Sequence, residues 1–142
     1  MKWKWTLLVV LALTLTTATL WAKEADQGTL QVKAKLVEIP SKFPPNDLYD
    51  YAYVMKYQVE GGKLDKQFIY VAHYKPRMAR KKIKDKMKKY VGGTLKKFKE
   101  GDVHQLLLEP NLQKIWQDAL VDEYFATDKK STRYWCLKVD PS

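Results

Sequence analysis

Residues 49–60 carry a strict alternation that restricts this chain to a β-rich fold. Every odd position is aromatic or apolar, namely Tyr49, Tyr51, Tyr53, Met55, Tyr57 and Val59, whereas the even positions are mostly polar. Successive side chains of a strand point to opposite faces, so this pattern predicts one long strand with an aromatic face. Gly61 and Gly62 then predict a turn, and residues 68–74 predict a second strand paired with the first as a hairpin.

Alternation also predicts strands over residues 29–39, 103–108 and 132–139. In the first of these, the apolar pattern slips phase at Val37, which indicates a β-bulge or a strong bend. The proline-rich residues 40–47 predict a loop between the first two strands.

A basic run separates the third and fourth predicted strands. Residues 75–99 hold twelve cations and one carboxylate, that of Asp85, while the whole chain has a net charge of +10. Apolar residues recur at helical spacing within the run, at Ala79, Ile83, Met87, Tyr90 and Val91. This spacing predicts an amphipathic basic helix that ends at Gly92. A second helix is predicted from Leu112, before the fifth strand.

The predicted elements define the fold class as mainly β. Five strands, with a helix between the third and fourth and a second helix before the fifth, follow the order of an OB-like barrel. A generic α+β sandwich of the same elements is the alternative.

The N-terminal residues resemble a secretory signal peptide. Lys2 and Lys4 precede an apolar segment at residues 7–15, and Ala18 or Ala22 offers a cleavage point. This segment is shorter than the roughly 20 apolar residues that a membrane span requires. We therefore expect residues 1–22 to direct secretion, most simply to the periplasm, and residues 23–142 to form one domain. An uncleaved N-terminal anchor is the alternative.

The sequence contains no recognisable catalytic signature. His73 and His104 lie on different predicted strands, where we expect His73 to make one hydrogen bond and His104 to face solvent. Because no paired-cysteine or paired-histidine motif is present, we expect no metal site and no cofactor. Cys136 is the only cysteine, which excludes an internal disulfide and predicts a buried, inert thiol. An intermolecular disulfide is the alternative.

Two surfaces are candidates for binding. The basic run predicts contact with an anionic partner through Arg77, Arg80, Lys81, Lys84 and Lys88, because its charge exceeds what solubility requires. The alternative is a helix whose lysines are only solvated. The tyrosine face predicts either core or a ligand-stacking platform, and Tyr49, Tyr51 and His73 are the candidates for that ligand face.

Three stretches resemble a known family: residues 68–74 (FIYVAHY), 98–110 (FKEGDVHQLLLEP) and 132–135 (TRYW). They are similar to small exported β-barrel modules found with bacterial SGNH-type (alginate O-acetyltransferase-like) polysaccharide-modifying proteins. The resemblance spans residues 36–139, although the segment between His73 and Gly101 is longer and more basic than in that pattern. It implies an accessory role and, because no hydrolase domain is present, no acetyl-transfer chemistry.

Together these features predict an exported, non-enzymatic binding or accessory module. Its expected partner is an acidic polysaccharide or an envelope protein that handles one. The alternatives are a nucleic-acid-binding OB-type protein, which export disfavours, and a peripheral binder of anionic membrane surfaces. A small hydrolase or transferase that depends on His73 is a further alternative.

Overall fold

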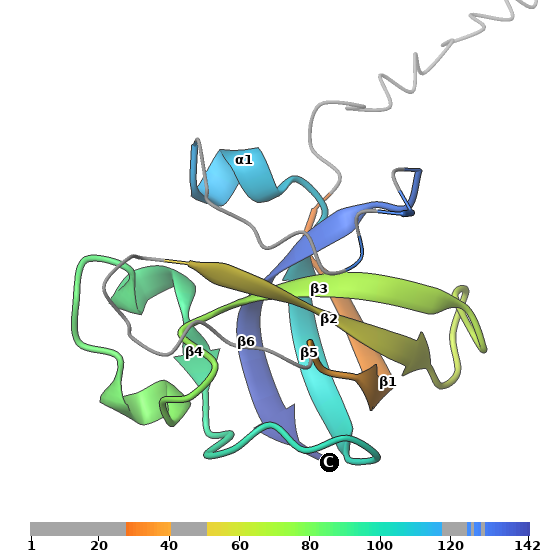
Figure 1. Cartoon of the computed structure of the whole chain (residues 1–142), viewed down its shortest axis with the longest axis horizontal. Coiled ribbons are helices and arrows are strands. Elements are labelled where there is room, and N and C mark those ends of the chain that lie inside the picture. Colours follow the sequence, from red (N-terminus) through yellow and green to blue (C-terminus); the bar gives the residue numbers. More distant parts are fainter. Residues whose placement is uncertain (1–27, 41–50, 118–124, 126, 129) are drawn as a thin grey trace, which may run out of the picture.

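Five strands close into a ring in the structure, a computed structural model that describes residues 28–40, 51–117, 125, 127–128 and 130–142. They are β1 (Leu30–Glu38), β2 (Ala52–Val59), β3 (Phe68–Tyr74), β5 (Val103–Glu109) and β6 (Arg133–Pro141). The sheet order is β3-β2-β1-β5-β6, and a parallel pairing of β3 with β6 closes the ring. Figure 1 shows β2 and β3 crossing in front of the other three strands. The prediction of a mainly β chain is confirmed.

The predicted hairpin and bulge are both present. β2 and β3 pair in antiparallel register, with Tyr53 opposite His73. Gly61 and Gly62 make the turn with φ angles of 83° and 70°, values that glycine adopts without steric cost. The register between β1 and β2 shifts between Leu36 and Glu38, which is where the sequence pattern slips phase.

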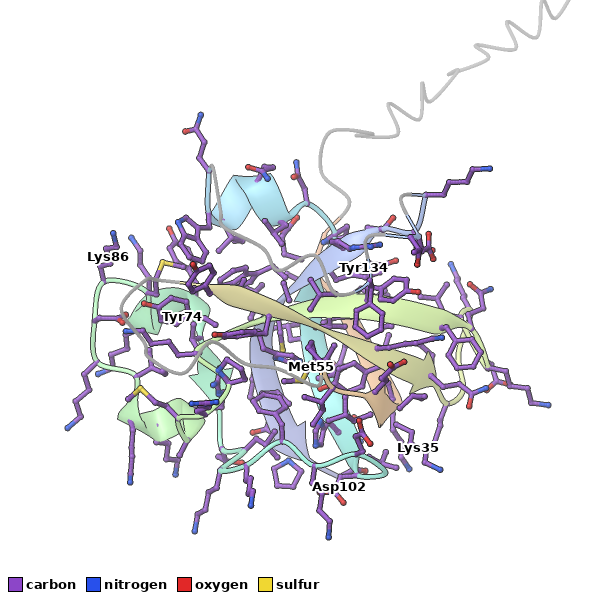
Figure 2. All side chains as sticks on the ribbon, in the orientation of Figure 1. Lys35, Met55, Tyr74, Lys86, Asp102 and Tyr134 are labelled. Atoms are coloured by element: carbon purple, nitrogen blue, oxygen red, sulfur yellow. The ribbon has the colours of Figure 1, made fainter. Side chains whose placement is uncertain are left out.

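One hydrophobic cluster fills the interior of the ring. It takes residues from all five strands, including Ala34, Tyr57, Val71, Leu106 and Cys136. Figure 2 shows Met55 inside the ring, whereas Lys35 and Lys86 extend outward. The tyrosine stripe of β2 is therefore core from Tyr53 onward, since Tyr53 and Tyr57 are both buried.

A second hydrophobic cluster covers the outer face of β2, β3 and β6. The strands contribute alternate residues such as Val54, Tyr74 and Trp135, and the basic segment contributes Ile83 and Met87. The indole nitrogen of Trp135 donates to the carbonyl of Tyr90 at 3.0 Å, which fastens the basic segment to β6. Both faces of the β2–β3 hairpin are thus covered by protein over most of its length.

The basic segment does not form the predicted amphipathic helix. It contains two single 3₁₀ turns, η1 (Arg80–Lys82) and η2 (Lys88–Tyr90), and the two-residue strand β4 (Gly92–Gly93) beside β6. Between the turns Ile83 is extended, with ψ at 114°. The apolar spacing still identifies the residues that are buried, because Ile83, Met87 and Val91 all pack onto the outer face.

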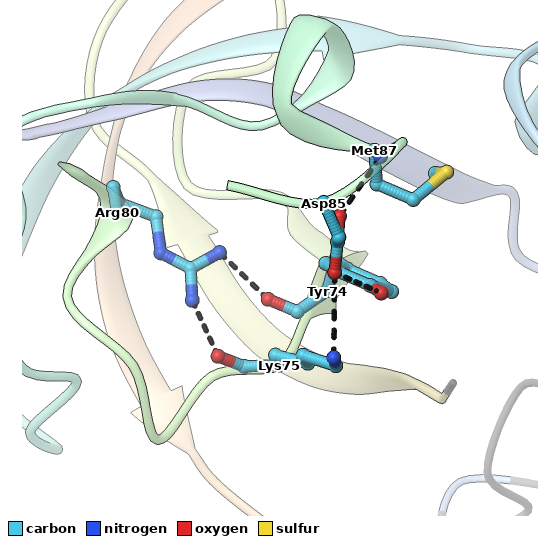
Figure 3. Close-up of polar contacts among 5 residues, drawn as sticks. All are labelled: Tyr74, Lys75, Arg80, Asp85 and Met87. Atoms are coloured by element: carbon cyan, nitrogen blue, oxygen red, sulfur yellow. Dashed lines mark hydrogen bonds and ion pairs between the residues drawn. The ribbon is translucent and has the colours of Figure 1, made fainter. Parts of the chain in front are cut away.

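Side chains that bind the local backbone explain this difference. The Arg80 guanidinium donates hydrogen bonds to backbone carbonyls of residues that come before it in the sequence. The Asp85 carboxylate accepts from the backbone N–H of Met87 at 2.9 Å (Figure 3). Such bonds offer the backbone an alternative to helical hydrogen bonds. The closely spaced lysines also repel one another, which lowers the stability of a regular helix.

The second predicted helix begins where expected and is one turn long within the described residues. α1 spans Leu112–Ile115, and the Asn111 side chain caps it by accepting from the N–H of Gln113. Residues 118–124, the predicted signal at residues 1–22 and the candidate Tyr49 lie outside the described residues. In the part of the chain that the structure describes, no helix is long and apolar enough to cross a membrane.

Candidate functional site

A basic cleft lies between the start of the basic segment and residues 94–98. It consists of two adjoining hollows. The larger, about 560 Å³, is lined by Arg77, Ala79, Lys81, Lys82, Thr94 and Lys96. The smaller, about 320 Å³, is lined by Ile39, Pro76, Arg77, Lys96, Lys97 and Phe98. The two hollows share Arg77 and Lys96, so we describe them together, with their five lining cations, as the basic cleft.

The lysines of the basic cleft carry uncompensated charge. Lys81, Lys82, Lys96 and Lys97 are exposed. Among the described residues, the ion pairs at 4 Å or less join Lys75 to Asp85 and Lys138 to Asp140, and neither involves a lysine of the cleft. Like charges gathered in a hollow raise the local potential and attract anions.

Arg80 holds one wall of the cleft from inside the protein. Its guanidinium donates to the carbonyls of Tyr74, Lys75 and Met78 at 2.8, 2.7 and 3.0 Å, and two of these bonds are drawn in Figure 3. Its backbone N–H donates to the carbonyl of Leu95 at 2.9 Å, which joins the two walls. This arginine therefore fixes the loop that presents Arg77 and Lys81.

The opposite wall is attached to β6. The backbone N–H groups of Thr94 and Leu95 both lie within hydrogen-bond distance of the Val139 carbonyl, and the Thr94 hydroxyl donates to Asp140 at 3.0 Å. Gly93 permits this close approach with a φ of 104°. The cleft is consequently built on the ring rather than on an isolated loop.

The structure separates the predicted anion-binding residues into three groups. Arg77 and Lys81 line the basic cleft. Lys84 and Lys88 are exposed on the segment around η2 and line neither hollow. Arg80 differs from the expected surface cation, because it is only 3% exposed and bonded to backbone carbonyls. Burial also lowers the pKa of Arg80. Its guanidinium therefore interacts with carbonyls inside the protein and not with a partner at the surface.

Behind the cleft, two histidines share one tyrosine inside the ring. The Tyr57 hydroxyl lies 3.0 Å from Nε2 of His73 and 3.1 Å from Nδ1 of His104. Because a phenol has one hydrogen, it donates to one imidazole and accepts from the other. The Phe98 ring, which lines the cleft, stands 4.5 Å from His73 and 5.9 Å from His104 between ring centres.

This buried group is electrically neutral apart from Arg80. Burial, with Arg80 and His104 nearby, holds the pKa of His73 well below its usual value of 6.5. Burial also lowers the pKa of His104, and it raises the pKa of the Tyr57 hydroxyl well above 10.0. Burial raises the pKa of the Cys136 thiol to about 12, and this cysteine is buried as predicted.

The expectation that His104 faces solvent is wrong, because His104 is completely buried. Its partner Tyr57 lies 47 residues away in sequence, so no local pattern indicated the contact. His73, a candidate for a ligand face, points into the ring, whereas Tyr51 is partly exposed beside Tyr53. Sequence reasoning also missed Thr94, Lys96 and Lys97 as cleft residues, although the buried Leu95 and Phe98 on either side of the two lysines were a usable signal.

The described residues hold no group of three or more histidine, cysteine or carboxylate side chains that could bind a metal ion. In comparisons with known proteins, no family model, no curated protein and no solved structure matches this chain. The geometry of the basic cleft is therefore the basis for a functional conclusion.

Proposed function

We propose that this chain is an exported, non-enzymatic OB-like barrel that binds an acidic polysaccharide through the basic cleft. It would act as an accessory module to envelope proteins that handle such a polymer, as the resemblance to modules of SGNH-type polysaccharide-modifying proteins implies. The signal-like residues 1–22 support export.

The order of the ring supports the OB-like assignment. Its neighbours run β1, β2, β3, β6, β5 and back to β1, with a parallel contact where β3 meets β6. A five-stranded ring of this kind, with a long connection between its third and fourth members, is typical of OB-type barrels. Such barrels recur as binders of oligosaccharides and oligonucleotides, so the fold is compatible with either class of polymer.

The observation that carries the proposal is the set of exposed lysines in the basic cleft, which form none of the ion pairs found among the described residues. Four exposed lysines line a depression whose walls are fixed to the ring by backbone hydrogen bonds. If these lysines served only to keep the segment solvated, they would not need to line a hollow. Burial of both histidines, which keeps them away from solutes, supports a binding role over catalysis.

A single-stranded nucleic acid fits the cleft less well than a polysaccharide. Proteins that bind single strands stack the bases on exposed aromatic side chains. Phe98, which lines the cleft, is only 9% exposed and is engaged by His73 and Arg80. Among its described lining residues the cleft therefore offers charge and a small apolar patch, but no exposed aromatic platform.

The test compares three polyanions across a salt series: polygalacturonate, DNA and vesicles containing phosphatidylserine. We expect polygalacturonate to bind most tightly at physiological salt and to weaken as salt rises. The cleft variant Lys82→Glu/Lys96→Glu should lose about tenfold or more in affinity. The control Lys84→Glu/Lys86→Glu has the same net charge and should lose less than about threefold.

Three results would contradict the proposal. Preferential binding of DNA or of vesicles at physiological salt would favour one of the alternatives. Equal losses in the two charge-reversal variants would mean that net charge, and not the cleft, determines binding. A turnover activity that His73→Ala abolishes in a folded protein would show that the chain is an enzyme.

A further inference from the structure

The two hollows of the basic cleft differ in chemistry. The larger hollow is the more polar of the two, with Lys81, Lys82 and Thr94 among its lining residues. The smaller hollow is more apolar and is lined by Ile39, Pro76 and Phe98 as well as by Lys97. Arg77 and Lys96 belong to both and stand where the hollows meet.

Each hollow has the size of a site for one small unit. Pockets for small ligands have volumes of about 300–1,000 Å³, and the two hollows measure about 560 and 320 Å³. A single unit would use only part of the charge, since Lys97 lines only the smaller hollow and Lys81 and Lys82 only the larger. The arrangement instead suits a ligand with at least two anionic groups in succession.

The walls are preorganised to hold such a ligand. Arg80 fixes three carbonyls of one wall and is joined to the other through Leu95. Phe98, which lines the smaller hollow, packs on His73, and its ring centre lies 5.2 Å from the Arg80 guanidinium carbon. A site that does not have to be ordered on binding retains more of its interaction energy.

We propose that the basic cleft recognises two consecutive acidic sugar residues, one in each hollow. This inference rests on the proposed function, because it assigns the polysaccharide to the same cleft. The carboxylate of one residue lies among Lys81, Lys82 and Lys96. The next residue occupies the smaller hollow beside Ile39, which is partly exposed, and turns its carboxylate to Lys97.

Galacturonate oligomers of one to four units, measured by calorimetry at low salt, test the inference. The dimer should bind about tenfold or more tighter than the monomer, because the second contact is intramolecular once the first is made. The trimer and tetramer should gain less than about threefold over the dimer, since the two hollows hold two units.

Matched variants locate the two units. Lys97→Ala should remove most of the gain from monomer to dimer and leave monomer binding within about twofold of the wild type. Lys82→Ala should weaken the monomer and the dimer alike. Lys84→Ala, an exposed lysine that lines neither hollow, is the control and should change neither.

The outcomes separate this inference from the proposed function. If long polygalacturonate binds but affinity rises smoothly from one unit to four, the two-unit site is wrong and the proposed function stands. A Lys97→Ala variant that keeps the full dimer gain would also overturn the two-unit site. If neither the polymer nor any oligomer binds, both proposals fail.

Discussion

Acidification should destabilise this protein before its carboxylates titrate, because His73 and His104 are buried in the neutral form. Both imidazoles are at most 1% exposed, both bond to Tyr57, and the Arg80 charge lies nearby. A proton on either ring would therefore place an unsolvated charge inside the ring of strands. In the unfolded chain the same imidazoles take up protons near pH 6.5.

The direction of the effect follows from these two states. The pKa of both histidines is lowered by folding, so below pH 6.5 the unfolded chain binds more protons than the folded one. Stability is full above pH 6.5 and falls as the pH decreases. Each imidazole contributes a slope of up to about 1.4 kcal/mol per pH unit, so the pair contributes up to about 2.7.

Urea unfolding followed by tryptophan fluorescence at pH 7, 6.5, 6, 5.5 and 5 measures this slope. The signal is available because Trp135 is completely buried in the folded protein. Carboxylates have ordinary pKa values of about 3.9–4.3 and contribute little in this range. His73 and His104 are the only histidines in the chain, so the slope reports them.

A matched variant isolates the two imidazoles. In His73→Gln/His104→Asn each amide can replace the ring nitrogen that faces Tyr57, Nε2 in the first case and Nδ1 in the second. The variant should lose the slope between pH 6.5 and 5 while keeping a cooperative transition. A wild-type stability that is flat over this range, or a variant that keeps the wild-type slope, would refute the reasoning.

Two further predictions concern the backbone and the thiol. Gly93→Ala should destabilise the protein by about 4 kcal/mol or more in urea unfolding, because its Cβ would lie 2.0 Å from the Val139 carbonyl oxygen. Gly101→Ala, with a similar φ and nothing within 4 Å, should lose only about 1 kcal/mol, and equal losses would count against the steric argument. Cys136 should resist iodoacetamide at pH 8 in the folded protein and react fully in urea, since burial raises its pKa to about 12. Rapid labelling of the folded chain, measured by mass spectrometry, would contradict that burial.

The strands could be predicted from sequence because each buries one face in the ring. Alternation around Tyr53 and Tyr57 identified β2, and the phase slip at Val37 identified the bulge in β1. These signals are local, since the side-chain period of a strand is two residues. The same local pattern placed Cys136 in the interior correctly.

The basic segment shows where local patterns stop being sufficient. Its apolar spacing identified Ile83 and Met87 as buried, and it did not identify the conformation that buries them. That conformation depends on Arg80, whose partners include the backbone of Leu95, and on Asp85, which binds the Tyr74 hydroxyl across eleven residues. Helical periodicity contains no information about such contacts. The contact between His104 and Tyr57 could not be predicted for the same reason, because the two residues come together only when the ring closes.

The basic cleft and the buried histidines are connected through Phe98 and Arg80. Phe98 lines the smaller hollow and packs on both imidazoles. Arg80 contacts the Phe98 ring and holds the wall that carries Lys81. Protonation of His73 would place a second cation beside Arg80 and behind Phe98, where the two like charges repel. Loss of polysaccharide binding below pH 6.5 should therefore accompany loss of stability. Above that pH, the affinity should depend on the cations that line the cleft and not on the histidines.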